Sequence, residues 1–235
     1  IENSLPETEI SADPENKWIF AGYQSGKYEL ITASGKIKTI RLKANSESKE
    51  IAGPWNVFFD SAAGGPGEVT FSALDDWSRR AEDGIKYYSG TAIYKKTFIA
   101  PAVSKNERVV LDLGKVAVMA KVILNGKNLG IYWKPPYRMD ITDALKKGEN
   151  LLEIEVVNLW INRQIGDEYL PDDTDRNPDG SLKSWPDWVV NGRTSPTGRF
   201  SFTSWRLYKK EDKLVESGLL GPVTIRMIEQ CKIKR

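Results

Sequence analysis

From residue 51 onward the chain is a succession of short apolar segments separated by turn residues, and this pattern constrains the fold more than any other feature. Segments 90–98, 108–113 and 120–124 are rich in β-branched and aromatic residues, which favour pleated strands. The dipeptide Asn125-Gly126, which follows the third segment, is typical of a two-residue hairpin turn. About eight or nine such strands with little helix predict an all-β, antiparallel fold, a β-sandwich or a jelly roll.

The N-terminal part of the chain has a different pattern. Residues 1–16 are polar and acidic and contain two prolines, which is typical of a flexible leader. Residues 17–50 contain alternating apolar segments around glycine turns and predict a β-hairpin segment. An isolated hairpin is marginally stable in water, so this one has to pack on the main domain or on a neighbour. We therefore expect a leader (1–16), a hairpin (17–50) and the jelly-roll sandwich (51–235).

Charge and rare residues exclude several classes of function. Lys and Arg total 34 against 32 Asp and Glu, a net charge of +2, which lacks the basic excess typical of nucleic-acid binding. No apolar run approaches the roughly 18 residues of a membrane-spanning helix, so we expect neither nucleic acid nor membrane as a partner. The chain has no His, which excludes serine triads and histidine zinc sites. With a single cysteine, Cys231, it has no intrachain disulfide.

A cluster of polar residues follows the apolar strand 150–157. A sugar subsite needs polar side chains beside an aromatic platform, and this region supplies both. Three alternatives stay open: a sugar subsite, a buried Arg163–Asp167 ion pair that holds the long loop that follows, and an interface with another domain. The carbohydrate-binding candidates here are Asn158, Trp160, Asn162, Arg163 and Asp167.

A second group of aromatic residues flanks the Pro135-Pro136 break. Trp133, Tyr137 and Arg138 lie beside the predicted Asn-Gly hairpin, and Trp188 lies in the later loop region. These side chains are either an exposed patch for a glycan or a domain, or aromatic residues packed in the core. We include all four among the carbohydrate-binding candidates.

An acidic loop at 172–180 predicts a structural calcium ion. Asp175, Asn177 and Asp179 place oxygens at alternate positions, with Gly180 next, as at the start of a calcium-binding loop. The acidic residue that would close such a loop is missing, because Pro186 occupies its position. An ordinary surface turn rich in Asp, Asn and Gly is the alternative. No other cofactor is expected.

Three stretches together resemble a known domain. Segments 84–98, 122–130 and 148–158 are similar in order and spacing to the sugar-binding jelly-roll domain of family 2 glycoside hydrolases, a galactose-binding-like β-sandwich. The resemblance implies a strand, an Asn-Gly hairpin, a single helical turn and an apolar return strand, in that order.

Further stretches resemble the C-terminal part of bacterial α-L-rhamnosidase-like enzymes of glycoside hydrolase family 106. They are segments 158–168, 177–188, 197–205 and 217–223. In that family the catalytic carboxylates lie in a separate barrel. The resemblance implies a periplasmic or secreted protein, in which segment 17–50 is the remnant of a preceding domain.

Several functions compete on this basis. The favoured one is a non-catalytic accessory β-sandwich whose partner is a carbohydrate or the catalytic domain of the same polypeptide. An autonomous carbohydrate-binding module and a protein-interaction or adhesion sandwich are alternatives. A small autonomous glycosidase needs two carboxylates facing one cleft. The adjacent pairs Asp75–Asp76 and Asp167–Glu168 do not fit, since neighbours on a strand point to opposite faces.

Overall fold

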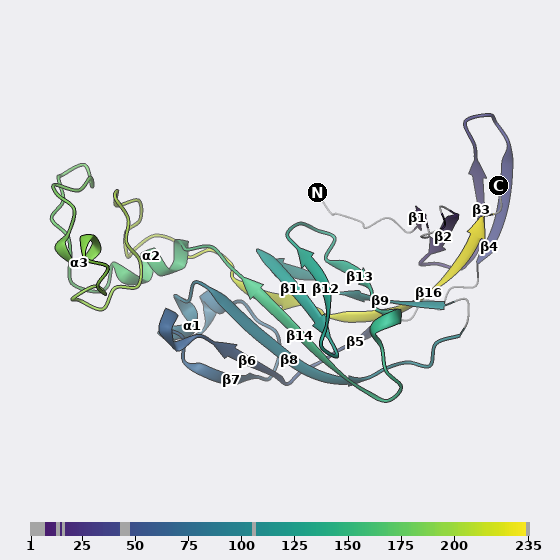
Figure 1. The fold of residues 1–235 in the computed structure, drawn as a ribbon, viewed down its shortest axis with the longest axis horizontal. Coiled ribbons are helices and arrows are strands. Elements are labelled where there is room, and N and C mark those ends of the chain that lie inside the picture. Colours follow the sequence, from purple (N-terminus) through teal and green to yellow (C-terminus); the bar gives the residue numbers. More distant parts are fainter. Residues whose placement is uncertain (1–7, 13–14, 16, 43–47, 105–106, 234–235) are drawn as a thin grey trace.

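The protein is an elongated molecule built around a β-sandwich. A computed structural model describes residues 8–12, 15, 17–42, 48–104 and 107–233. Figure 1 shows the sandwich in the middle, the segment with α2 and α3 projecting at one end, and strands β1–β4 at the other. In the part of the chain that the structure describes, no helix is long and apolar enough to cross a membrane.

One face of the sandwich is a six-stranded antiparallel sheet. Its longest pairing joins β14 to β8 in register from Glu149 opposite Ile99 to Val157 opposite Thr91. In spatial order the strands are β12 (Lys127–Tyr132), β11 (Met119–Leu124), β14 (Glu149–Val157), β8 (Thr91–Ile99), β6 (Trp55–Phe59) and β7 (Gly67–Phe71).

The opposite sheet is organised around the long strand β16. Its first half pairs with β9 and its second half pairs with β2, so the sheet extends beyond the sandwich toward the N-terminal strands. The strands are β1 (Thr8–Ala12), β2 (Trp18–Gly22), β16 (Thr224–Ile233), β9 (Glu107–Asp112) and β13 (Arg138–Asp140), with β5 (Ser48–Glu50) also on β16. Two short pairs complete the β structure: β10 (Lys115–Ala117) with β15 (Gly218–Gly221), and β3 (Gly26–Ile31) with β4 (Ile37–Leu42).

The main core lies between the two sheets, where alternate side chains of each strand point inward. Trp55, Val57 and Phe59 of β6 are fully buried, while the residues between them are exposed. Trp77 and Tyr94 stack in this core, and the Trp77 indole N–H donates to the Tyr94 hydroxyl at 2.6 Å. The prediction of an all-β antiparallel sandwich is confirmed.

Helices are short and lie outside the sheets. They are η1 (Ser61–Ala63), η2 (Trp77–Arg79), α1 (Asp83–Lys86), η3 (Thr142–Ala144), α2 (Ile161–Asp167) and α3 (Asp187–Val190). The predicted single helical turn before β14 is η3. The Thr142 hydroxyl accepts from the Val109 N–H at 2.8 Å, so this turn is bonded to β9.

The Asn125-Gly126 hairpin forms as predicted between β11 and β12. Asn125 and Gly126 have φ values of 54° and 81°, the left-handed conformations that a tight hairpin of this kind requires. The Asn125 side chain donates to the Ala144 carbonyl at 2.8 Å and accepts from the Leu151 N–H at 3.1 Å. The turn is therefore tied to η3 and to β14.

The N-terminal segments differ from the expected division. The predicted leader contains strand β1, and β2 pairs with β1 and β16 rather than with β3. In the described N-terminal residues β3 and β4 form a two-stranded hairpin of their own, which Figure 1 shows beside the end of β16. β2 pairs with the second half of β16 on the edge opposite β9, so the N-terminal strands continue the second sheet. The division into a leader (1–16), a hairpin (17–50) and a sandwich (51–235) stays a prediction.

Candidate functional site

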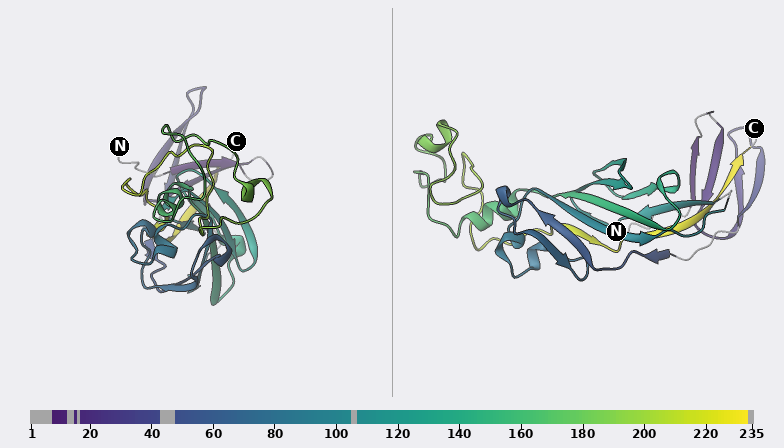
Figure 2. Two further views of the ribbon diagram at one scale, coloured as in Figure 1. Left: turned by 90° about the vertical axis from the view of Figure 1, so that its left-hand side faces the viewer. Right: turned by 60° about the horizontal axis from the view of Figure 1, so that its bottom comes forward.

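The most distinctive surface feature is the segment 158–217, which we call the arm. It leaves the sandwich after β14 and returns at β15, and Figure 1 and the right-hand view of Figure 2 show it at the end opposite β1–β4. Two short helices, α2 and α3, are its regular elements. Most of the predicted carbohydrate-binding residues lie in the arm or at its base.

Asn158 and Asn162 hold the base of the arm. Asn158 donates to the Tyr88 carbonyl at 2.8 Å and accepts from the Gly90 N–H at 3.0 Å. Asn162 donates to the Val215 carbonyl at 2.7 Å and accepts from the Val215 N–H at 2.8 Å. Both amide groups are buried and bonded on both sides, and they replace main-chain pairing where the chain leaves the sheet, while sugar binding by Asn158 and Asn162 stays a prediction.

Arg163 and Asp167 are also internal. Asp167 accepts from the main-chain N–H groups of Phe200 and Ser201, at 3.0 and 2.7 Å. Arg163 lies over the Phe200 ring, 4.7 Å from its centroid, and donates to the Ala63 carbonyl at 3.3 Å. Burial lowers the pKa of the Arg163 guanidinium, an effect that the charge of Asp167 opposes. These two side chains hold the 200–201 segment in place, and a sugar contact by either of them stays a prediction.

An ionic network that the sequence did not indicate shapes the middle of the arm. Arg199 donates to Glu168 at 2.9 Å and to Asp172 at 3.0 Å, and Arg206 contacts the same two carboxylates. The Arg199 side chain is 9% exposed. Because Glu168 and Arg199 are 31 residues apart, no local sequence pattern predicts that they pair. These ion pairs stabilise the conformation of the arm, which has little regular secondary structure.

The surface of the arm is unusually apolar. Trp160 is 52% exposed, which fits an accessible aromatic side chain, while Trp188 is partly buried and donates to the Asp173 carbonyl at 3.1 Å. Trp188 packs edge to face on Phe202, so its ring is part of the arm's own packing. Other exposed apolar side chains of the arm are Tyr169, Trp185, Val190, Phe200, Trp205 and Leu207.

The candidate calcium loop is held by its own hydrogen bonds. Asp179 accepts from the N–H and the hydroxyl of Ser181, at 3.0 and 2.7 Å. Asn177 donates to the Ser181 hydroxyl at 3.0 Å. Among the described residues, no group of three or more His, Cys, Asp or Glu is arranged to hold a metal. The side chains of Asn177 and Asp179 are thus bonded within the turn, and calcium binding by Asp175, Asn177 and Asp179 stays a prediction.

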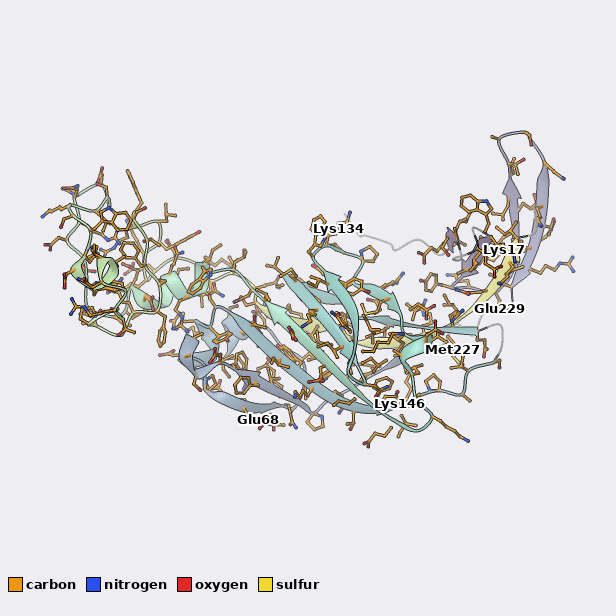
Figure 3. The ribbon with its side chains drawn as sticks, viewed as in Figure 1. Lys17, Glu68, Lys134, Lys146, Met227 and Glu229 are labelled. Atoms are coloured by element: carbon orange, nitrogen blue, oxygen red, sulfur yellow. The ribbon has the colours of Figure 1, made fainter. Side chains whose placement is uncertain are left out.

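The three candidate residues beside the Pro135-Pro136 loop differ in their exposure. Trp133 is 67% exposed, and Figure 3 shows its neighbour Lys134 at the outer tip of the loop. Tyr137 is buried and donates to the Val118 carbonyl at 2.9 Å, and its role as a sugar contact stays a prediction. Arg138 pairs with Asp112 at 2.6 Å and lies over the Tyr23 ring.

Arg138 borders a hollow on the outer side of the second sheet, which we call the outer hollow. Its volume is 330 Å³. Its lining comes from β1, β2, β9, β13 and β16, strands that are distant in sequence but adjacent in the sheet. The lining residues are Glu9, Ser11, Ala21, Tyr23, Val110, Pro136, Arg138, Met139, Asp140, Ile228 and Gln230.

A second, larger cavity lies between the β3–β4 hairpin and the end of β16, and we call it the apolar cleft. Its volume is 570 Å³. Beneath it, Phe20, Ile40 and Leu42 form a small core of their own. Ile31 and Ile37 at its edge are 69% and 60% exposed. The cleft is lined by Ile10, Trp18, Leu30, Ile31, Thr32, Lys36, Ile37, Lys38 and Ile233.

The adjacent carboxylate pairs named from the sequence have structural partners. Asp76 accepts from the N–H groups of Ser78 and Ser217, each at 3.0 Å. Asp75 pairs with Arg80 at 3.1 Å. Asp167 and Glu168 are bonded within the arm, as described above. None of these four carboxylates is placed as the acid or base of a glycosidase.

Comparison with known proteins identifies the central domain. Residues 74–186 match the family described as glycosyl hydrolase 2 galactose-binding domain-like. Residues 74–186 are a galactose-binding-like domain of the glycoside hydrolase 2 type. The match confirms the resemblance seen in the sequence. The galactose-binding-like domain accordingly includes β8 to β14 and the first half of the arm.

A curated relative extends the similarity to nearly the whole chain. The galactose-binding-like domain and its flanks are 44% identical over 229 residues to a protein of Formosa agariphila named "Putative beta-glucuronidase". The alignment covers 97% of this chain and 19% of the relative. The chain therefore spans about a fifth of the length of that protein.

Among solved structures, the chain is similar to the rhamnosidase from Novosphingobium sp. PP1Y. The TM-score is 0.62 with 22% sequence identity, over 95% of this chain and 25% of the rhamnosidase. This similarity shows a shared fold. A β-D-glucuronidase from Dictyoglomus thermophilum aligns with a TM-score of 0.47 and 21% identity, over 78% of this chain and 28% of that one.

Proposed function

We propose that the chain is a non-catalytic accessory β-sandwich of a larger bacterial glycoside hydrolase, and that it packs against another domain of the same polypeptide through the apolar cleft. The similarity to a fifth of a longer protein supports the first part of this proposal. The apolar cleft supports the second. The parent enzyme is proposed to be α-L-rhamnosidase-like and periplasmic or secreted, in line with the sequence resemblance and with the fold shared with a rhamnosidase.

The single observation that carries the packing role is the open apolar edge around β3 and β4. Ile10, Ile31 and Ile37 together leave a contiguous apolar lining in contact with water. Contiguous exposed apolar surface is unfavourable in a soluble protein and typically marks an interaction site. Because Phe20, Ile40 and Leu42 form a small core below, a domain seated in the cleft would extend that core.

A catalytic role for this chain has little support. General acid and base groups of a glycosidase must reach the two sides of one glycosidic bond. Asp76 and Asp167 are buried and bonded to main-chain N–H groups, while Asp75 and Glu168 pair with arginines. We therefore place catalysis in another part of the polypeptide.

An autonomous interaction module is the second candidate, and the exposed side chains of the arm favour it. Trp160, Trp185 and Trp205 are 52%, 63% and 49% exposed. Tryptophan in this setting is typical of surfaces that contact a glycan or a protein. An adhesion or protein-binding role would make the arm, rather than the cleft, the contact surface.

The packing role is tested by polar substitutions in the cleft of the full-length protein. We expect the double variant Ile31→Asn, Ile37→Asn to lower the unfolding temperature of the full-length protein and to uncouple the unfolding of its domains in calorimetry. The 235-residue chain with the same changes should keep its own unfolding temperature, because both side chains are already exposed.

The matched control is Ile99→Asn with Ile131→Asn. These residues are 60% and 58% exposed and lie outside the cleft. The control should leave the full-length protein unchanged. Equal behaviour of the two double variants would reject the cleft as the packing surface. Assays of the full-length protein on aryl α-L-rhamnosides and aryl β-D-glucuronides would decide its substrate class.

A further inference from the structure

The outer hollow has an apolar floor that is separate from the other buried clusters of the described residues. Ala21, Tyr23, Val110 and Ile228 form a buried cluster separate from the main core. These four residues all line the hollow. The cluster therefore lies on the outer face of the second sheet, where one side is closed by the strands and the other opens into the hollow.

The rim of the outer hollow is polar, and its groups have bonding capacity left. Arg138 uses its Nε to donate to Asp112, which fixes the guanidinium and leaves its two terminal nitrogens without a hydrogen-bond partner among the described residues. In the same described part, the Tyr23 hydroxyl has no hydrogen-bond partner either. Glu9, Asp140 and Gln230 complete the rim. Donors and acceptors thus surround an apolar floor.

The Tyr23 ring is not an open stacking platform. The guanidinium carbons of Arg138 and Arg226 lie 5.1 and 5.9 Å from its centroid. Burial raises the pKa of the Tyr23 hydroxyl, and the charge of Glu9 adds to this effect, so the hydroxyl stays protonated at neutral pH. Tyr23 therefore presents a hydroxyl donor, and the aliphatic residues of the floor provide the apolar contact.

The charges around the hollow favour a neutral ligand. Arg138 is paired with Asp112, and Arg108 lies 3.9 Å from Asp140. Glu9 adds a carboxylate on the rim. A ligand carboxylate would approach Glu9 and Asp140, whereas hydroxyl groups can donate to both and accept from Tyr23 and Arg138. Hydroxyl groups on a ring with an apolar face match this arrangement.

We propose that the outer hollow is a binding subsite for one neutral sugar residue, held by the Tyr23 hydroxyl, the Arg138 guanidinium and the rim carboxylates. Its volume of 330 Å³ lies near the lower end, about 300 Å³, of ligand pockets, which suits a single pyranose ring. The site forms where β16 lies between β2 and β9, which puts β1, β2, β9 and β13 in one sheet. The proposal rests on the proposed accessory role only for its choice of carbohydrate as ligand class.

The experiment is a titration of the 235-residue chain with methyl α-L-rhamnopyranoside and methyl β-D-glucopyranoside, followed by NMR of the Arg138 side-chain Nε–H. Methyl β-D-glucuronide is the anionic comparison. We expect saturable shifts with at least one neutral glycoside, with a Kd of about 1–10 mM, as befits one shallow subsite. The glucuronide should bind more weakly.

Tyr23→Phe is the decisive variant, since it removes only the hydroxyl. We expect it to weaken binding by about two- to tenfold, the range of one hydrogen bond. Tyr169→Phe, an exposed tyrosine on the arm, is the matched control and should bind normally. Gln230→Ala on the rim gives a second test that does not disturb the floor, and it should also weaken binding.

Three results would overturn the proposal: no saturable shift with either neutral glycoside, tighter binding of the glucuronide, or unchanged affinity in both Tyr23→Phe and Gln230→Ala. This test uses ligand binding by the 235-residue chain. The cleft test uses domain coupling in the full-length protein, so failure of one proposal is distinguishable from failure of the other.

Discussion

The Asn158 side chain donates to the Ser217 hydroxyl at 3.2 Å, and this bond joins the two ends of the arm across 59 residues of sequence. Asn162 donates to the same hydroxyl at 3.1 Å. Ser217 in turn donates its N–H to Asp76 at 3.0 Å. The arm is therefore attached to the sandwich through a buried polar network whose members are hydrogen-bonded to one another. Such a network is cooperative, so the loss of any member weakens the remaining hydrogen bonds.

Asn158→Ala should destabilise the sandwich. It leaves the Tyr88 carbonyl and the Gly90 N–H without their side-chain partner, so we expect the free energy of unfolding to fall by about 2–3 kcal/mol. Urea unfolding followed by tryptophan fluorescence measures this. Asn191→Ala, on an exposed residue of the arm, is the control and should cost less than about 1 kcal/mol.

Arg199→Ala should loosen the arm without melting the sandwich. Arg199 bonds Glu168, Asp172 and two main-chain carbonyls, and each bond to a charged group contributes about 1.5–3 kcal/mol. We expect faster cleavage by chymotrypsin, whose aromatic sites the variant keeps, within 158–217 and little change in the unfolding temperature of the sandwich. Arg193→Ala, which removes an exposed arginine paired with Asp187, should leave the cleavage rate unchanged.

Tyr94→Phe tests the aromatic core. The Tyr94 hydroxyl accepts from the Trp77 indole and from the Leu219 N–H at 2.6 and 3.2 Å. Its removal leaves two buried donors unpaired, so the free energy of unfolding should fall by about 1–3 kcal/mol. Unfolding in guanidinium chloride measures the loss. An unchanged stability would show that these bonds contribute nothing net.

Alkaline pH should destabilise the protein through its buried tyrosines. Burial raises the pKa of Tyr88 and Tyr94 above the ordinary value of 10, so the folded state holds their protons more tightly than the unfolded state does. The resulting stability is complete below pH 10 and is lost as the pH rises through the folded pKa values. Urea midpoints at pH 8 and pH 10.5 should differ, and Tyr94→Phe should reduce the difference.

The acidic loop should be stable without calcium. Asp179 and Asn177 already bond Ser181, so their side chains are committed to the turn. We expect the same unfolding temperature in EDTA and in millimolar calcium, measured by differential scanning calorimetry. An increase with calcium that is lost in Asp175→Asn would contradict this expectation and establish the site that the spacing predicted.

Much of the sandwich was predictable from local pattern. Strand alternation of the kind in Trp55, Val57 and Phe59 fixes which face is buried, and Asn125-Gly126 fixes a hairpin through its left-handed backbone. The family resemblance was visible because the strands, the Asn-Gly hairpin and the helical turn follow one another in the order of that family. Such features depend on neighbours in sequence, so one sequence suffices to find them.

The candidate sites were less predictable, because polarity does not reveal burial. Asn158, Asn162 and Asp167 had the composition of a sugar subsite, yet the fold directs them inward to satisfy the main chain of distant segments. Trp133 had the same pattern as Tyr137 and is exposed, while Tyr137 is buried. Side-chain direction depends on which segment packs opposite, and that is not encoded locally.

The sequence alone thus determined the β architecture, the hairpins and the exclusion of histidine-dependent chemistry, since these follow from composition and short-range periodicity. Only the tertiary structure placed β2 on the free end of β16 and brought Tyr23 beside Arg138, residues that are distant along the chain. Both the outer hollow and the apolar cleft arise from that pairing. Both cavities depend on pairing between strands that are far apart in the sequence, and no single segment determines that pairing by itself.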